Sequence, residues 1–142
     1  MKYKMVLLLF FTIMLFNICC GFGQTESDLS DIQIKTLLKN FYTIYITEFP
    51  KAGNENKLDS IRGFYCSQNL LNKINTDSLN YDRFLKAQDS DTSCLNTLEI
   101  GKDSTQSNVY IVSYIDNYEK SKIIMHLSII SQIDSFKIDS VW

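Results

Sequence analysis

The last third of the chain alternates apolar and polar residues, which is the pattern of β-strands that bury one face. Four strands are expected, over residues 95–100, 108–116, 122–132 and 136–142. The third is the clearest, because one face would carry only apolar side chains: Ile123, Met125, Leu127 and Ile129. In the last strand, one face would carry Phe136, Ile138 and Trp142. Short polar segments separate the strands, so chain neighbours should pair antiparallel.

Before the strands, apolar residues recur at intervals of three and four, which predicts helices with one apolar face. The longest should run from about residue 32 to 48, with Ser30 as its N-cap and Gln33 completing a capping box. Pro50 then prevents the helix from continuing. The apolar face would hold Ile34, Leu37, Leu38, Phe41, Tyr45 and Phe49.

Two shorter helices are expected next, over residues 57–65 and 68–75, and Ser67 is the predicted N-cap of the second. Helices followed by an antiparallel meander define an α+β fold, with N-terminal helices packed on a bent four-stranded sheet. A chain of 142 residues has room for one domain. We place this domain at residues 32–142, behind a polar leader of residues 24–31.

The second expected strand is apolar on both faces, so a single layer of helices would leave one face uncovered. One face carries Val109, Ile111 and Ile115, and the other carries Tyr110, Val112 and Tyr114. The uncovered face needs either a second layer or another molecule. We expect a homodimer through the face of Tyr110, Val112 and Tyr114.

The first 23 residues have the pattern of a cleaved signal peptide. Lys2 and Lys4 precede a nearly unbroken apolar run, residues 5–20, which is shorter than the roughly 20 residues that a membrane-spanning helix needs. Small residues stand three and one positions before Gln24, which fits cleavage after Gly23.

Lipidation at Cys19 or Cys20 is the alternative to soluble export, and Cys20 is the preferred acceptor. Phe16 and Asn17 stand where a lipidation signal has an aliphatic residue, which disfavours this alternative. An uncleaved anchor is the third reading. All three place the protein in the periplasm or cell envelope, with membrane contact only through the anchor.

The net charge and the cysteine content bear on the possible partners and on the presence of a disulfide. The net charge is −2, and no cluster of basic residues offers the positive stripe that nucleic-acid binding needs. Cys66 and Cys94 remain after processing, and an even number of cysteines in an exported protein suggests a disulfide. Two buried free thiols are the alternative.

Three segments resemble a small exported bacterial domain family of unknown function within the nuclear transport factor 2-like superfold. The resemblance covers about residues 32–142 and rests on these stretches: Leu38-Lys39-Asn40-Phe41-Tyr42-Thr43-Ile44-Tyr45, Asp82-Arg83-Phe84-Leu85-Lys86-Ala87-Gln88-Asp89 and Phe136-Lys137-Ile138-Asp139-Ser140-Val141. It implies a cone-shaped fold with a pocket between sheet and helices. Family members are periplasmic proteins or lipoproteins without established catalytic residues.

The chain departs from this family just after the middle stretch. Members often carry an aromatic residue shortly after the Gln-Asp pair, whereas this chain has Asp91-Thr92-Ser93-Cys94. The role of that aromatic residue therefore does not carry over.

The sharpest polar candidates are Gln88 and Asp89. They would either line the mouth of the pocket or satisfy backbone groups where the chain enters the sheet, as aspartates do in turns. A tyrosine–aspartate pocket like those of isomerases with this superfold is a further candidate, by fold analogy alone. Its members would be Tyr42, Tyr45 and Tyr65 with Asp82 or Asp89.

The remaining chemistry is sparse. His126 is the only histidine, and its place on a half-apolar strand face favours a partly buried structural role. Residues 89–100 begin like a calcium loop but lack its glycine and its final glutamate. We expect no metal and no cofactor, and no phosphate-binding or hydrolase motif is present.

These observations predict an exported, non-enzymatic binding protein whose partner is an unknown protein or a small apolar ligand. An immunity-type inhibitor of a periplasmic toxin is the first alternative, because such inhibitors are small, acidic and free of cofactors. A small-molecule enzyme with a tyrosine–aspartate pocket is the second.

Overall fold

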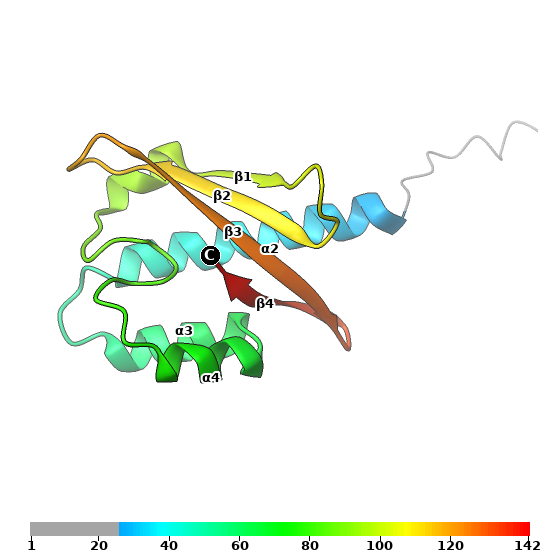
Figure 1. The fold of residues 1–142 in the computed structure, drawn as a ribbon, viewed down its shortest axis with the longest axis horizontal. Helices are drawn as coiled ribbons and strands as arrows, with labels where there is room; N and C mark the ends of the chain where they lie inside the picture. The colour runs from blue at the N-terminus through cyan, green and yellow to red at the C-terminus, as the bar shows by residue number, and fades with distance from the viewer. Residues whose placement is uncertain (1–25) are drawn as a thin grey trace, which may run out of the picture. The chain divides into compact units, whose positions relative to one another are not determined.

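The computed structural model describes residues 26–142, so the predicted signal segment and the lipidation candidate Cys20 lie outside the described residues. The chain divides after Ser30, and residues 31–142 form one compact unit. None of the described helices is long and apolar enough to cross a membrane. The elements follow each other as α2 (Glu26–Glu48), α3 (Glu55–Tyr65), α4 (Gln68–Thr76), η1 (Thr92–Thr97), β1 (Glu99–Lys102), β2 (Val109–Ile115), β3 (Lys122–Gln132) and β4 (Ser135–Val141) (Figure 1).

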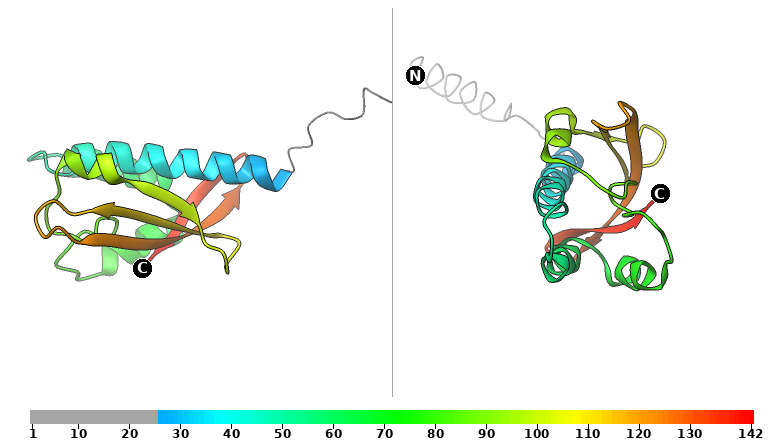
Figure 2. Two further views of the ribbon diagram at one scale, coloured as in Figure 1. Left: turned by 90° about the horizontal axis from the view of Figure 1, so that it is seen from above. Right: turned by 90° about the vertical axis from the view of Figure 1, so that its left-hand side faces the viewer.

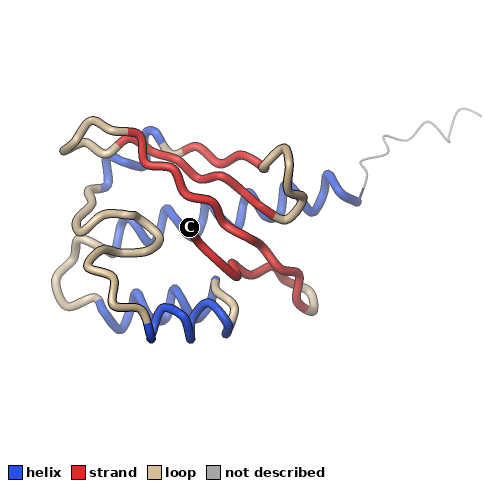
Figure 3. The backbone as a smooth tube through the Cα atoms, viewed as in Figure 1, coloured by secondary structure: helices blue, strands red, loops and turns tan. Residues whose placement is uncertain are grey.

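The strands form a four-stranded sheet in the order β1-β2-β3-β4, with every neighbour antiparallel. The predicted α+β class, with helices followed by an antiparallel meander, is therefore confirmed (Figure 3). β3 has the predicted bounds. The first strand was expected from residue 95, but a 3-10 helix occupies Thr92–Thr97 and β1 begins at Glu99. The side chain of Asp91 caps this helix by accepting a hydrogen bond from the backbone nitrogen of Ser93, which favours the helical turn over an extended strand.

α2 covers the sheet face that we expected to form a homodimer. The side chains of Tyr110, Val112 and Tyr114 are buried in the core, together with Met125 and Leu127 of β3. Figure 2 shows α2 running along this face of the sheet. The expectation of a dimer through these three residues is therefore wrong, because the helix supplies the second layer that the face requires.

A β-bulge sets which end residues of β4 reach the core. The register between β3 and β4 shifts between Ser128 and Ile129, so Val141 rather than Trp142 follows Ile138 onto the core face. Trp142 exchanges backbone hydrogen bonds with His126 and stacks on its ring at 5.8 Å. The predicted grouping of Trp142 with Ile138 is wrong, because one extra residue reverses the alternation.

The helix starts differ from the sequence-based expectations in two of three cases. α2 begins at Glu26, so Ser30 lies inside the helix and its hydroxyl donates to the carbonyl oxygen of Ser27. α3 begins at Glu55, after Asn54. The predicted cap of α4 is confirmed, since Ser67 Oγ accepts a hydrogen bond from the backbone nitrogen of Leu70 at 3.1 Å.

Phe41 is the centre of the core. Its ring is fully buried, and ring centroids of four other aromatic residues lie between 5.0 and 5.4 Å away. These neighbours come from α2, from α3 and from the segment after α4: Tyr42, Tyr45, Tyr65 and Phe84. Phe41 thus joins three parts of the chain through edge-to-face and stacked contacts.

Phe41→Ala should lower the free energy of unfolding by about 3–5 kcal/mol, because it leaves a cavity among four rings. Urea denaturation followed by circular dichroism measures this loss. Ile44→Ala in the same helix is the matched control, since Ile44 is 40% exposed and its truncation should cost far less. Equal losses in the two variants would contradict a core centred on Phe41.

Candidate functional site

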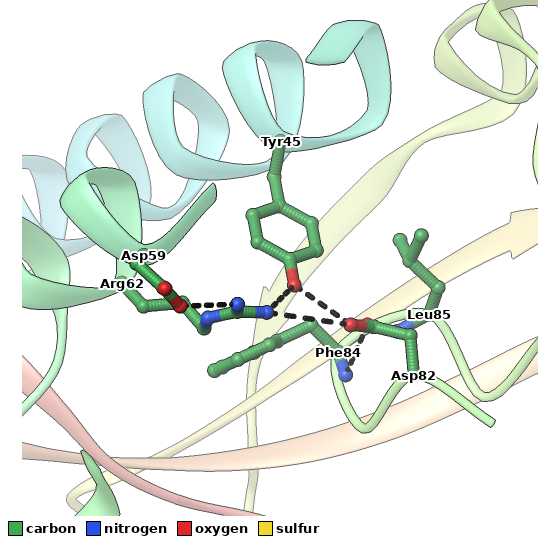
Figure 4. A network of polar contacts seen from close by, with 6 residues as sticks. All are labelled: Tyr45, Asp59, Arg62, Asp82, Phe84 and Leu85. Carbon is green, nitrogen blue, oxygen red and sulfur yellow. Dashed lines mark hydrogen bonds and ion pairs between the residues drawn. The ribbon is translucent and has the colours of Figure 1, made fainter. Parts of the chain in front are cut away.

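A buried carboxylate, that of Asp82, joins α2, α3 and the segment after α4 (Figure 4). Its Oδ2 accepts a hydrogen bond from the Tyr45 hydroxyl at 2.7 Å. Its Oδ1 accepts from the backbone nitrogens of Phe84 at 2.8 Å and Leu85 at 3.0 Å. The aspartate therefore forms the turn that places Phe84 and Leu85 in the core.

Arg62 of α3 completes the network. Its Nη1 donates to the Tyr45 hydroxyl oxygen at 2.8 Å and lies 4.0 Å from Asp82 Oδ2. Its Nη2 lies 2.6 Å from Oδ1 of Asp59, one helical turn earlier. The guanidinium thus connects a buried pair with an exposed carboxylate, which holds Tyr45 between a cation and an anion.

Burial dominates the electrostatics of this pair. The side chain of Asp82 is only 10% exposed, and this burial raises the pKa of Asp82 above its ordinary value, against the hydrogen bond from Tyr45. Burial also raises the pKa of Tyr45 far above its usual range, and the neighbouring Asp82 charge adds to this effect. Tyr45 therefore keeps its proton at neutral pH and acts as a hydrogen-bond donor to Asp82.

Two hollows lie against the network, and we call them the large cleft and the small cavity. The large cleft has a volume of about 640 Å³ and the small cavity about 170 Å³. Arg62, Leu79, Tyr81 and Asp82 line both. The large cleft is also lined by Phe49, Pro50, Glu55, Leu58, Asn80, Gln88 and Asp89.

Arg83 fixes the far wall of the small cavity, which it lines together with Ile74 and Asp77. It forms an ion pair with Asp77, and its Nη1 donates to the carbonyl oxygen of Val141 at 3.2 Å. Neighbouring residues of one turn thus point to different parts of the molecule, Asp82 to the helices and Arg83 to the end of β4.

The four predicted pocket residues lie in three places. Gln88 and Asp89 are exposed and line the large cleft, and Asp89 Oδ1 also accepts a hydrogen bond from the backbone nitrogen of Ser90 at 2.8 Å. Tyr45 is buried in the network behind the cleft. Tyr42 lies in the core, where its hydroxyl contacts the sulfur of Met125 at 3.6 Å, and it lines neither hollow.

The predicted disulfide is not formed, because Cys66 and Cys94 are both buried free thiols. Cys66 follows α3 and bridges to Ile138 on β4, whereas Cys94 lies in η1, which packs on β2. β3 separates those two strands, and each strand spacing is about 4.8 Å. The thiols thus lie in the same core but against different strands, with β3 between them. Burial raises the pKa of Cys66 to about 12, so its thiol is unreactive at neutral pH.

His126 has the partly buried place that the sequence predicts. Its Nδ1 lies 4.0 Å from Oδ2 of Asp103, and its ring stacks on Trp142, away from both hollows. Among residues 26–142, no group of three or more histidine, cysteine, aspartate or glutamate side chains is placed to hold a metal ion.

No family model matches the chain, and no curated protein matches it. Among solved structures, the chain is similar to a crystal structure of a protein of unknown function from Bacteroides thetaiotaomicron VPI-5482. The TM-score is 0.71 and the sequence identity is 22%, over 82% of this chain and 95% of that chain. At this identity the similarity shows the fold alone, an α+β arrangement of helices followed by an antiparallel sheet.

Arg62 and Arg83 are site residues that the sequence patterns did not single out. Asp82 was named only as one of two partners for a tyrosine. A signal for Arg62 was present, since Asp59 precedes it by three residues on an otherwise amphipathic helix. Its contact with Tyr45 depends on how two helices pack, which no local pattern encodes.

Tyr45→Phe should lower the free energy of unfolding by about 1–3 kcal/mol, because Arg62 and Asp82 both lose a buried hydrogen-bond partner. Thermal and urea denaturation measure the change. Tyr65→Phe is the matched control, since Tyr65 packs on Phe41 but its hydroxyl has no hydrogen bond within the described part of the chain. If both variants were equally stable, the network would contribute nothing to folding.

Asp82→Asn should change how stability depends on pH. Because the pKa of Asp82 is raised in the folded state, the folded protein binds this proton more tightly than the unfolded chain does. Ionised Asp82 therefore lowers the free energy of unfolding, and this destabilisation disappears as the pH falls through the raised pKa of Asp82. Relative to Asp82→Asn, the wild type should gain stability between neutral pH and about pH 4.

Urea denaturation of both proteins over a pH series tests this. Taking the difference between them cancels other carboxylates, such as Asp103, whose pKa is lowered by its hydrogen bonds with Thr105. If the free energy of unfolding of the wild type, relative to Asp82→Asn, stayed constant or fell toward acid pH, the fold would not raise the pKa of Asp82.

Proposed function

We propose that the protein is an exported, non-enzymatic binding protein with a nuclear transport factor 2-like domain, and that it binds its partner in the large cleft. The helices and the four-stranded meander agree with this superfold at the level of fold class. The basic and apolar pattern of residues 1–23 supports export. The partner is a small ligand with an apolar part, or a protein side chain that enters the cleft.

The proposal rests on the contrast between the buried polar groups of the network and the exposed side chains of the large cleft. The buried polar groups of Tyr45, Arg62 and Asp82 all have partners that hold the fold together. The side chains at the opening of the cleft are not used in this way. Leu79 and Tyr81 are each 42% exposed there, and Gln88 has no hydrogen-bond partner among residues 26–142. The lining of the large cleft is mostly polar, and Leu79 and Tyr81 add exposed apolar surface, so the cleft offers a ligand both polar and apolar contacts.

Leu79→Asp should abolish binding in the large cleft, because it replaces an exposed apolar side chain that lines both hollows with a charge. Native mass spectrometry of the protein purified gently from its own cells measures binding as an added mass. The wild type should carry a small molecule or a second protein, and Leu79→Asp should not. The mass also distinguishes an N-terminus at Gln24 from an acylated Cys20.

Ile124→Asp is the matched control, since Ile124 has a similar exposure of 45% but lies on β3 and lines neither hollow. It should retain the added mass. A wild type without any added mass, or an equal loss in both variants, would contradict binding in the cleft. A bound protein that inhibits growth when expressed alone would favour the immunity-type inhibitor over a small-ligand carrier.

A tyrosine–aspartate enzyme is the second candidate, and one observation favours it. The structure brings Tyr45 and Asp82 together, and Asp82 lines both hollows with a raised pKa. Such a carboxylate could accept a proton from a substrate. However, its two oxygens already accept three hydrogen bonds, so a substrate would have to displace one of them.

A further inference from the structure

A second recess lies apart from the large cleft, and we call it the hairpin groove. It has a volume of about 580 Å³, and its lining residues come from α2, the end of α3 and the β3–β4 hairpin. Its apolar wall consists of Leu37, Phe64 and Phe136. Phe64 is 69% exposed, which is unusual for a phenylalanine in a helix beside a core. The hairpin groove and the large cleft share no lining residue.

An apolar side chain projects at the rim of this groove. Ile133 stands at the tip of the hairpin and is 94% exposed, although turn positions usually carry polar residues or glycine. Its chain neighbours Gln132 and Asp134 both line the groove. The turn is tight, since Gln132 pairs with Ser135 and Asp134 has a positive φ of 57°. The turn therefore holds Ile133 outward.

Two unpaired charges flank the same surface. Asp134 has no ion pair within residues 26–142. The Lys137 ammonium lies 5.1 Å above the Phe64 ring and donates to the carbonyl oxygen of Phe64, without a carboxylate partner in the same part of the chain. Both residues line the groove. One surface of the described chain thus carries an apolar projection, an apolar recess, an anion without an ion pair and a cation that contacts Phe64 but no carboxylate.

We propose that this surface binds a second copy of the chain, with Ile133 of each protomer seated in the hairpin groove of the other. A two-fold axis halfway between projection and recess places each Ile133 in the partner's recess at the same time, which closes the assembly as a dimer. The same operation brings Asp134 of one protomer toward the partner's Lys137, and the reverse. The burial of Tyr110 and Val112 under α2 leaves this surface, rather than that face of β2, for self-association.

The self-complementarity favours a second copy over other occupants. A bilayer would accept Ile133 and Phe64, but it would not need a recess, and the opposite charges of Asp134 and Lys137 leave the surface without a net attraction to anionic lipid. An unrelated protein would need its own apolar projection to fill the groove and its own recess for Ile133. A second copy supplies both, together with the opposite charges.

Sedimentation velocity of the processed protein over a dilution series tests the proposal. The wild type should pass from dimer to monomer on dilution, and Ile133→Asp should raise the dissociation constant by about tenfold or more, as for an apolar anchor in a recess. The thermal midpoint of diluted, monomeric protein should be unchanged, because Ile133 contributes almost nothing to the monomer core. Tyr118→Asp is the matched control, with 71% exposure in the β2–β3 turn, and should dimerise like the wild type.

A charge exchange tests the two-fold arrangement itself. Asp134→Lys and Lys137→Asp should each weaken self-association, because each homodimer would then face like charges twice. Mixing the two variants should restore a dimer, since both pairs become opposite charges in the heterodimer. Lysine is tolerated at the φ of position 134, because Lys86 and Lys120 adopt φ values of 50° and 55°.

Four outcomes would overturn the proposal. They are a wild type that is monomeric at every concentration, a dimer that Ile133→Asp leaves unchanged, a mixture of the charge variants that does not associate, and binding of the wild type to anionic phospholipid vesicles that Ile133→Asp abolishes without any self-association. None of them bears on the large cleft, so the proposed function would stand or fall separately.

Discussion

The buried carboxylate of Asp82 is the interaction on which the arrangement of the helical half depends. An ionised group at this depth is unfavourable, and three hydrogen bonds of 2.7–3.0 Å offset part of the cost of burying it. Two of them fix the backbone of Phe84 and Leu85, and the carbonyl oxygen of Leu85 then accepts the Tyr114 hydroxyl at 2.6 Å. A continuous polar path thus runs from α3 through α2 and the turn to β2. Removing one member leaves its neighbours buried without partners, so the path acts as a unit.

The hydrogen bonds of Asp82 distinguish the polar groups that stabilise the fold from those that have no partner within the described residues. Tyr45 and Arg62 are held in place by Asp82 and by each other. Arg62 lines the large cleft, whereas Tyr45 is buried behind it. The groups at the opening, Gln88 among them, belong to a loop that the same carboxylate anchors. The segment after α4, which lines the cleft, has little regular structure, but the hydrogen bonds of Asp82 anchor it to the core. Rigid support of this kind reduces the ordering that binding requires.

The sequence predicted what depends on neighbours along the chain and missed what depends on neighbours in space. The period-two pattern of β3 and the cap of α4 by Ser67 are local, and both are confirmed. The face that carries Tyr110 could not be assigned, because its alternation is apolar on both sides and only the position of α2 decides between them. The β4 bulge reverses the alternation without any mark in the sequence. Tyr45 and Asp82 are 37 residues apart, so their pairing could be named only as one of several combinations.

The edges of the sheet limit how the molecule can associate. Beyond β4, the chain at Cys66 and Ser67 closes the edge, since Cys66 bridges to Ile138 and the backbone nitrogen of Ser67 donates to the Ile138 carbonyl oxygen at 2.8 Å. β1 forms the other edge, with only four residues and charged Glu99 and Lys102 at its ends. Short, charged edges disfavour the addition of another strand. The edges therefore disfavour association by strand addition, whereas Ile133 and Phe64 are among the exposed apolar side chains and have a recess beside them.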